Sequence, residues 1–370
     1  MLKDIYKDIS AFHPGYYVQE IIEDMGITQS EFAKRLNTTS KTLSKLLNGE
    51  IPLSNDLAEN LSLMLGTSIN VWINLQKKYE EKCSEIDKKR KIDKEKKFLK
   101  MLDYNYFVAL KVVEPHEDEN HRIIDLCTAL KVSSLSILEQ PDLLTACKTS
   151  ILDVQTKNVV NANAWIQLGE NIARNTNCSE YSKEKLKKIL KELRGLTREN
   201  LSLAFSIIKE KLANCGIVLV ALPYLKNSGL NGAVKWLTKD KVMLLINDRG
   251  KDTALFWFTL FHELKHVLQK KLKAVYLTTT KEHKNILTLG RNDEKEEQEA
   301  NEFARDQLID KRKYIKFVEL RKFTFENIKR FANELNIAEE IVVGRLKYDG
   351  YLKWSEYPQL QCKYQFVIEG

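Results

Sequence analysis

The sequence lacks an apolar run long enough to cross a bilayer, and its charged N-terminus is unlike a signal peptide. It also lacks a CxxC pair, because its six cysteines lie scattered over 370 residues. Scattered cysteines of this kind are typical of reduced thiols inside a cell. These absences predict a cytoplasmic protein that has no membrane partner.

What the chain does contain is the composition of an ordinary globular protein. Hydrophobic residues make up 43% and charged residues 30% of it, which leaves ample apolar side chains for a core. Its length predicts two or three domains. The formal net charge of +8 fits a nucleic-acid partner but does not identify one.

A segment near residue 262 contains the pattern His-Glu-x-x-His within a run that has no glycine or proline. On an α-helix, His262 and His266 share one face, so both imidazoles can reach one metal ion. Glu263 lies one step round the helix, beside the ion. Zinc hydrolases use this arrangement: two imidazoles hold Zn2+, and the carboxylate takes a proton from water.

The five-residue pattern also occurs by chance, and an amphipathic helix with two exposed histidines is the competing interpretation. The flanking residues argue against it, because large apolar side chains surround both histidines on nearly every side of the helix. A helix of this kind is buried, and buried neutral histidines need partners. A metal ion is an efficient partner.

A third ligand is expected on a second helix downstream. This stretch carries a helical stripe that predicts one packed face, formed by Ala300, Phe303, Ala304, Gln307 and Leu308. Glu297 borders the stripe, and the amide of Asn301, one turn later, could orient a ligand. Glu299 is the competing ligand, and a solvated acidic face is the alternative for the stretch as a whole.

The segment Phe-His-Glu-Leu-Lys-His, followed by Glu-Gln-Glu-Ala-Asn-Glu-Phe-Ala, resembles the ImmA/IrrE family of metallo-endopeptidases. The resemblance implies a zincin fold in which Glu297 is the third ligand of Zn2+ and Glu263 is the catalytic carboxylate. Two departures from the family pattern are visible. Lys265 stands where the family more commonly has Gly, and Asp310 stands where it usually has Pro. Neither position is a ligand.

The hydrophobic period changes to that of strands just before the motif. Strands are expected within 216–222, 232–237 and 242–247. A small sheet against the His-Glu-x-x-His helix is how zincins are built, and its edge strand can pair with an extended peptide. Residues 271–293 are expected to form a loop. His283 within it is either a donor to the transition state or a surface histidine.

The first 80 residues predict a compact helical module with a helix-turn-helix. Thr28 and Glu31 form a capping-box pattern at the start of one short helix, and Asn37 tolerates the left-handed conformation that follows it. Thr39 caps a second helix over residues 40–47, which an Asn-Gly pair stops. Two short helices around a tight turn form the DNA-binding motif.

The second of these helices presents short polar and basic side chains outward, which suits the major groove of DNA. The candidate DNA contacts are Gln29, Thr39, Ser40, Lys41, Thr42, Ser44 and Lys45. The alternative is an interaction bundle with a polar face. The charge balance favours that alternative, since residues 1–80 hold eight Lys/Arg against ten Asp/Glu. However, four basic residues cluster around the expected DNA face, namely Lys34, Arg35, Lys41 and Lys45. Five of the ten acidic residues lie on other helices, namely Glu20, Glu23, Asp24, Asp56 and Glu59.

Several segments of this module resemble HigA-type antitoxins, a branch of the XRE helix-turn-helix proteins. They are His13-Pro-Gly, Ile27-Thr-Gln, Leu46-Leu-Asn-Gly, Pro52-Leu-Ser and Leu65-Gly-Thr-Ser-x-x-x-Trp-Ile-Asn-Leu-Gln. The resemblance covers the whole module. It implies a partner in double-stranded operator DNA.

The expected fold class is mainly α with a small β-sheet, that is, α+β. In chain order we expect a helix-turn-helix domain, a basic helical spacer, a helical region, a zincin-like domain and C-terminal helices packing on it, at residues 1–80, 81–102, 103–213, 214–320 and 321–370. A solvated helix is the expectation for the spacer. The helical region shows no catalytic constellation, and its His116 and His121 flank acidic residues and are expected to be exposed.

These observations lead to one hypothesis and one alternative. The hypothesis is a DNA-binding, antitoxin-like transcriptional regulator, homodimeric on a palindromic operator, whose zinc endopeptidase domain cleaves a regulatory protein partner. The alternative is a non-proteolytic HigA-type antitoxin or repressor that uses the zincin fold for sensing or for binding a cognate toxin. Substitution of Glu263 separates the two, because only the hypothesis requires its carboxylate.

Overall fold

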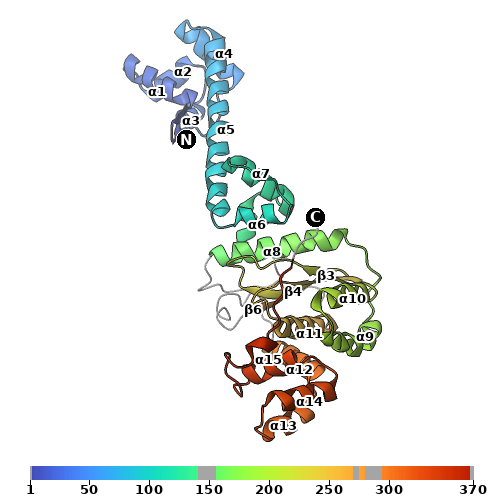
Figure 1. Ribbon diagram of the computed structural model, residues 1–370. Coiled ribbons are helices and arrows are strands. Elements are labelled where there is room, and N and C mark those ends of the chain that lie inside the picture. Colours follow the sequence, from blue (N-terminus) through green and yellow to red (C-terminus); the bar gives the residue numbers. More distant parts are fainter. Residues whose placement is uncertain (1, 141–155, 270–274, 280–293, 367–370) are drawn as a thin grey trace. The chain divides into compact units, whose positions relative to one another are not determined.

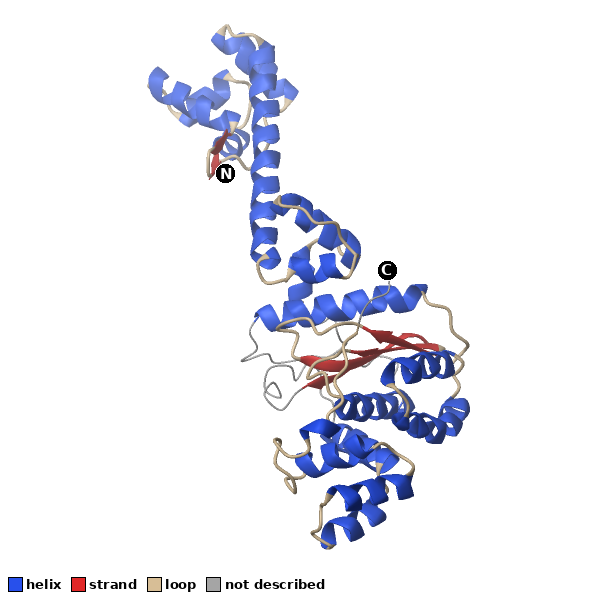
Figure 2. Ribbon diagram, viewed as in Figure 1, coloured by secondary structure: helices blue, strands red, loops and turns tan. Residues whose placement is uncertain are grey.

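The computed structural model describes residues 2–140, 156–269, 275–279 and 294–366 (Figure 1). The chain forms two compact units, residues 1–96 and residues 97–370. Helices dominate both, and the strands of the described residues form one two-stranded and one four-stranded sheet (Figure 2). The predicted α+β class, mainly helical with little sheet, is confirmed.

The N-terminal unit begins with a β-hairpin and continues as a helical bundle. Its elements are β1 (Lys3–Tyr6), β2 (Ile9–Phe12), α1 (Pro14–Met25), α2 (Gln29–Arg35), α3 (Ser40–Leu47), α4 (Asn55–Leu65) and the long α5 (Ile69–Leu99). Thr28, Thr39 and Ser54 cap α2, α3 and α4, each hydroxyl accepting a hydrogen bond from a backbone N–H of the first turn. The capping box predicted at Thr28 is only half formed, because the Glu31 carboxylate pairs with Arg35.

The core of this bundle lies between α1, α2, α3, α4 and the start of α5. It consists of fully buried side chains that include Phe32, Leu36, Leu43, Leu46, Leu61 and Trp72. Because these side chains fill the interior, the polar residues of α2 and α3 are left on the outside.

The β-hairpin packs against α5 through ion pairs and a small apolar cluster. Arg90 binds both oxygens of Asp4 at 2.7 and 3.0 Å. Nearby, Lys89 pairs with an aspartate of the hairpin turn at 2.9 Å, and Ile86 is fully buried against the strand residue Ile9. The expectation of a solvated spacer is therefore wrong for this part of α5, because one side of the helix carries the hairpin.

The C-terminal unit places a four-stranded sheet between two helical layers (Figure 1). Its strands are β3 (Ile217–Ala221), β4 (Leu230–Thr238), β5 (Lys241–Ile246) and β6 (Val275–Thr279). Their spatial order is β3-β5-β4-β6, with β3 parallel to β5 and β4 antiparallel to both of its neighbours. The helices before the sheet are α6 (Tyr104–Ala109), α7 (Glu119–Leu130), α8 (Thr156–Asn175), α9 (Lys183–Gly195) and α10 (Leu201–Ala213). Those after β5 are α11 (Thr253–Gln269), α12 (Glu294–Leu308), α13 (Lys311–Glu319), α14 (Phe325–Leu335) and α15 (Glu339–Tyr348).

Successive side chains along the strands point to opposite faces of the sheet, and this divides the core into two halves. One set of strand side chains joins α8 and the helices beyond it, and includes Val218, Val220, Ala233, Met243 and Leu245. The other set joins α11 and its neighbours, and includes Leu219, Val234, Trp236, Leu244 and Ile246. β3, β4 and β5 are therefore buried on both faces, as expected for strands covered by helices on both sides.

Asparagine side chains on α8 hold the preceding helical region in place. Asn161, Asn163 and Asn171 donate hydrogen bonds to the backbone carbonyls of Met101, Leu138 and Ala129 at 2.9, 2.7 and 3.0 Å. All three asparagines are buried. The segment that contains α6, α7 and the short 3-10 helix Leu135–Glu139 is thereby joined to α8, and α8 lies on the sheet.

The three predicted strands are confirmed as β3, β4 and β5. The prediction of a loop over 271–293 is wrong for Val275–Thr279, which pairs with β4 as β6. The rest of that segment, with His283, lies outside the described residues. The hairpin and β6 were missed because strands of four or five residues carry too few alternations to show a period.

The described cysteines are all free. Among the helices of the described residues, none combines the length and the apolar character that a bilayer crossing requires.

We expect Ile86→Ala to loosen the hairpin. The substitution removes the buried side chain that anchors Ile9, at a cost of about 2–3 kcal/mol, so amide hydrogen exchange in β1 and β2 should accelerate about 30-fold or more. Ile92→Ala is the matched control, because Ile92 lies on the same helix and is 39% exposed. Equal exchange in the two variants would contradict the packing described for α5.

Candidate metal centre

Two histidines and one glutamate from different helices meet on the inner side of α12. His262 and His266 lie one turn apart on α11, with their Nε2 atoms 3.0 Å apart. Glu297 on α12 places one carboxylate oxygen 3.4 Å from the Nε2 of His262 and the other 3.1 Å from that of His266. The structure therefore brings together the three residues that the sequence suggested as ligands.

The spacing of these donor atoms fits a small cation. Ligand bonds of about 2.0–2.1 Å in a tetrahedral zinc site place neighbouring donor atoms about 3.3 Å apart, close to the three separations observed here. The ligand atoms of His262, His266 and Glu297 all lie within 4.8 Å of one another, so these residues form a group that could hold a metal ion. Two imidazoles and a carboxylate are also the donor set of a catalytic zinc site with one position left open.

Burial distinguishes the two sides of the site. The His262 and His266 side chains are 2% and 0% exposed, whereas the Glu297 side chain is 29% exposed. Burial raises the pKa of the Glu297 carboxyl, but its hydrogen bonds to both histidines outweigh this effect and hold the pKa well below its usual range. Glu297 is therefore a carboxylate at neutral pH, which is the form that ligates a metal.

Gln269, which the sequence reading missed, orients one of the imidazoles. Its Oε1 lies 2.9 Å from the Nδ1 of His266, and its Nε2 donates to the Glu296 carbonyl at 3.4 Å. A hydrogen bond from Nδ1–H fixes the tautomer whose Nε2 carries the lone pair toward Glu297. The signal was available, because Gln269 lies three residues after His266 on the same helical face. For His262, Nδ1 is buried without a hydrogen-bond partner among the described residues.

Glu299 is not placed as a ligand. Its carboxylate pairs with Lys265 at 3.3 Å and lies 3.5 Å from the Nε2 of Gln269. Lys265 thus points away from the donor atoms, as expected from its position on the helix. Asn301 is half-buried on α12, and its side chain makes no hydrogen bond within the described chain, so the structure does not show it orienting a ligand.

Glu263 lies against the sheet at Gly232, a residue that has no side chain and so leaves room for it. The residue is fully buried. A Cβ atom added to Gly232 on β4 would lie 2.5 Å from its Oε1 and 3.1 Å from its Cδ. Gly232 therefore allows α11 and β4 to approach with the Glu263 carboxylate between them, a requirement that sequence reading did not identify.

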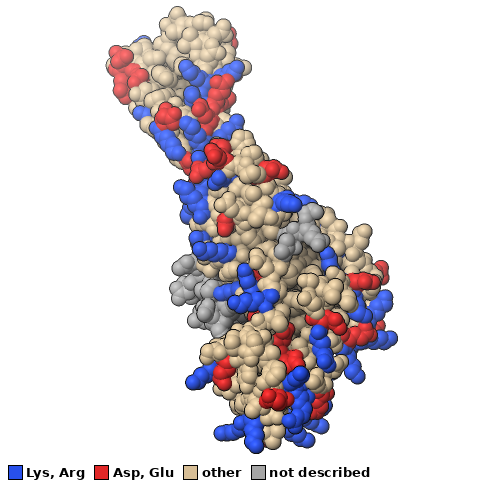
Figure 3. Space-filling view, in the orientation of Figure 1, with Lys and Arg blue, Asp and Glu red and all other residues tan. Residues whose placement is uncertain are grey.

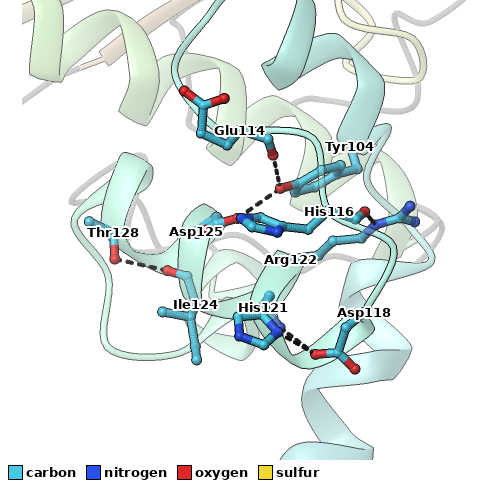
Figure 4. Close-up of polar contacts among 9 residues, drawn as sticks. All are labelled: Tyr104, Glu114, His116, Asp118, His121, Arg122, Ile124, Asp125 and Thr128. Atoms are coloured by element: carbon cyan, nitrogen blue, oxygen red, sulfur yellow. Dashed lines mark hydrogen bonds and ion pairs between the residues drawn. The ribbon is translucent and has the colours of Figure 1, made fainter.

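The histidines of the helical region form a separate, exposed cluster (Figure 4). Their rings stack with centroids 5.4 Å apart. His116 lies 3.5 Å from Asp125, and His121 lies 2.8 Å from Asp118. The side chains of His116 and His121 are 42% and 67% exposed, so the predicted exposure is confirmed.

The candidate DNA contacts gather on the outer faces of α2 and α3. Gln29, Ser40, Lys41, Ser44 and Lys45 are exposed, and Thr42 is half-buried. The Thr39 hydroxyl accepts from the Thr42 N–H at 3.0 Å and lies 2.9 Å from the Thr42 hydroxyl. Thr39 therefore stabilises the start of α3 as its N-cap.

Comparisons with known proteins agree with the division into parts. Residues 18–72 match the helix-turn-helix family. The chain is 30% identical over 83 residues to the uncharacterized HTH-type transcriptional regulator YddM of Escherichia coli (strain K12). The matched stretch covers 21% of this chain and 88% of that protein. The chain belongs to the helix-turn-helix transcriptional regulators.

The second part of this regulator matches a different family. Residues 216–347 match the IrrE N-terminal-like domain of the M78 peptidase family, a span that holds the sheet and the candidate metal centre. The regulator is also 33% identical over 79 residues to virulence-associated protein A' of Dichelobacter nodosus, covering 20% of this chain and 69% of that protein. The crystal structure of a putative antidote protein of a plasmid maintenance system from Nostoc punctiforme is 27% identical, covers 23% of this chain and 92% of its own, and has a TM-score of 0.22.

We expect Gly232→Ala to destabilise the regulator by about 1–3 kcal/mol, because the new methyl group overlaps the Glu263 carboxylate. Gly195→Ala is the control, since nothing lies within 4 Å of a Cβ added there. Chemical denaturation measures both. A double-mutant cycle with Glu263→Ala should show a favourable coupling, and an additive double mutant would disprove the proposed contact.

Proposed function

We propose that this DNA-binding regulator is a zinc-dependent endopeptidase that cleaves a protein of its own regulatory circuit. The convergence of His262, His266 and Glu297, with Glu263 on the same helix as the histidines, is the observation that carries the proposal. The match to the M78 peptidase family supports the reaction class.

Bound Zn2+ would polarise the scissile carbonyl and acidify water for attack. The chain's own residues supply the rest. His262, His266 and Glu297 would hold the ion, while Gln269 fixes the His266 tautomer. Glu263 takes the proton from the attacking water and passes it to the leaving amine. Its burial excludes bulk water from this transfer.

The sheet offers a place for an extended substrate. In the described chain β6 is the last strand beyond β4, so one row of its backbone N–H and C=O groups faces away from the sheet. An extended peptide can add to such an edge by main-chain hydrogen bonds. α11 also contacts β6, so a peptide on this edge would run beside the helix that carries both histidines.

The other half of the proposal concerns DNA. The outward residues of α2 and α3 would contact a double-stranded operator in the cytoplasm, with two copies of the regulator on the two halves of a palindrome. The buried core of the bundle leaves Lys41, Ser44 and Lys45 on one exposed face, which supports α3 as the helix that enters the groove.

The metal site is tested by replacing two glutamates of α12, Glu297 and Glu299, one at a time. Glu297→Gln is expected to lower zinc content at least tenfold, because it removes a charged ligand. Glu299→Gln is the matched control and should retain zinc, since that carboxylate pairs with Lys265. Metal analysis of the dialysed proteins gives the answer. Zinc retained in the Glu297 variant but lost from the control would reverse the assignment.

The reaction is tested with Glu263→Gln in the native host. Cleavage of the partner should fall by about 10²–10⁴-fold, since the general base is lost, while zinc content and operator binding remain. The variant should also trap the intact partner for identification by mass spectrometry. Unchanged behaviour of the circuit would instead favour a non-proteolytic antitoxin or repressor that uses the domain for sensing or toxin binding.

The proposed DNA-binding face is tested with two kinds of variant. One removes side chains expected to contact DNA, and the other removes a helix cap. Ser44→Ala with Lys45→Ala should weaken operator binding about tenfold or more and leave thermal stability unchanged, because both side chains are exposed. Thr39→Ala should lower stability by about 1 kcal/mol through loss of the helix cap. Operator binding that survives the double substitution would remove α3 from the interface.

A further inference from the structure

The excess positive charge of the chain lies entirely outside the helix-turn-helix module. Residues 311–330 contain eight Lys/Arg and two Asp/Glu, a net charge of +6, against +8 for the whole chain. Residues 1–80 carry eight basic and ten acidic residues, a net charge of −2. The part of the chain that is expected to meet DNA is therefore poor in the charge that neutralises phosphates.

The basic residues of this second segment lie on the surface of α13, of α14 and of the turn between them. They are Lys311, Arg312, Lys313, Lys316, Arg321, Lys322, Lys329 and Arg330, and each is exposed. On α13, Arg312 and Lys316 lie opposite the buried Tyr314 and Phe317. Lys and Arg side chains are prominent over this end of the unit in Figure 3.

Few of these charges are used inside the protein. Lys313 pairs with Glu334 at 3.0 Å, and Arg330 binds the amide of Asn327 at 3.1 Å. In the part of the chain that the structure describes, the other six basic side chains make no ion pair. Exposed cations without internal partners remain available to an external polyanion.

The turn between α14 and α15 repeats the local geometry of the helix-turn-helix. Phe, Ala, Leu and Asn at positions 32, 33, 36 and 37 recur at a constant spacing of 299 residues, at positions 331, 332, 335 and 336. Asn37 and Asn336 have φ angles of 54° and 53°. In each turn the next residue donates to the carbonyl of the alanine, at 2.9 Å in the first and 3.1 Å in the second.

The second helix of this repeat cannot read bases. At the positions that correspond to Ser44 and Lys45, α15 has Val343, which is buried, and Gly344. A Cβ added to Gly344 would lie 2.8 Å from the Cβ of Ala254 on α11. Because α15 is packed against the metal-site helix, the side chains in this region that are open to nucleic acid are the exposed basic ones of α13, of α14 and of the turn between them.

We propose that the basic surface of α13 and α14 binds the phosphate backbone of double-stranded DNA without sequence preference. DNA is the polyanion that the same chain engages through its helix-turn-helix, and the cations that this module lacks are supplied here. Such contacts raise affinity and lengthen residence on DNA around the operator. The proposal stands apart from the peptidase activity, because no residue of the metal centre takes part.

The test measures how binding depends on salt. The full-length regulator is titrated onto a labelled duplex of about 40 base pairs that lacks an operator, shorter than the DNA persistence length, and anisotropy is followed at several KCl concentrations. The variant Lys316→Gln with Arg321→Gln and Lys322→Gln should reduce the slope of log K against log[salt] by about 2–3, because each phosphate that a cation neutralises adds about 0.9 to the slope. Circular dichroism checks that the helical content is unchanged.

The control makes the same charge change elsewhere in the same unit. Lys187→Gln with Lys188→Gln and Lys191→Gln removes three exposed lysines of α9 and should leave the slope within about 1 of the parent. Equal reductions in both variants would show a general charge effect and overturn the proposal, as would an unchanged slope in the α13–α14 variant. If that variant instead lost binding to vesicles of phosphatidylserine and phosphatidylcholine, with its duplex slope intact, the surface would be a membrane site and the proposal would be wrong.

Discussion

The C-terminal unit depends on one constraint, which is that two buried imidazoles on a single helix turn must face a charged carboxylate from another helix. Neutral or charged, such rings are costly inside an apolar core unless their nitrogens are engaged. Glu297 engages both Nε2 atoms, and Gln269 engages the remaining nitrogen of His266. The contact between α11 and α12 is therefore set by polar geometry as well as by packing.

The sheet also holds α11, the helix that carries both imidazoles, in position. α11 contacts β4, β5 and β6, and Gly232 leaves room on β4 for the Glu263 carboxylate. Trp236 and Val234 on the same face of β4 belong to the apolar core that surrounds α11. α11 thus contacts the sheet through Glu263 and contacts α12 through its two histidines.

Sequence reasoning identified the residues of the site better than their supports. The i, i+4 spacing of His262 and His266 is a local property of any helix, so it could be seen in the sequence alone. The choice between Glu297 and Glu299 required the packing of two helices, because both lie near the same stripe. Gly232 could not have been found, since its role depends on a side chain 31 positions later in the chain. The hairpin and β6 were missed because short strands are defined by their partners.

The bonds from the α8 asparagines end on main-chain carbonyls, at Met101, Leu138 and Ala129. A carbonyl is present whatever amino acid occupies the position. The region that contains α6 and α7 can therefore exchange its outward side chains without losing its attachment to α8. Substitutions can redesign that exterior while the anchorage beneath it stays the same.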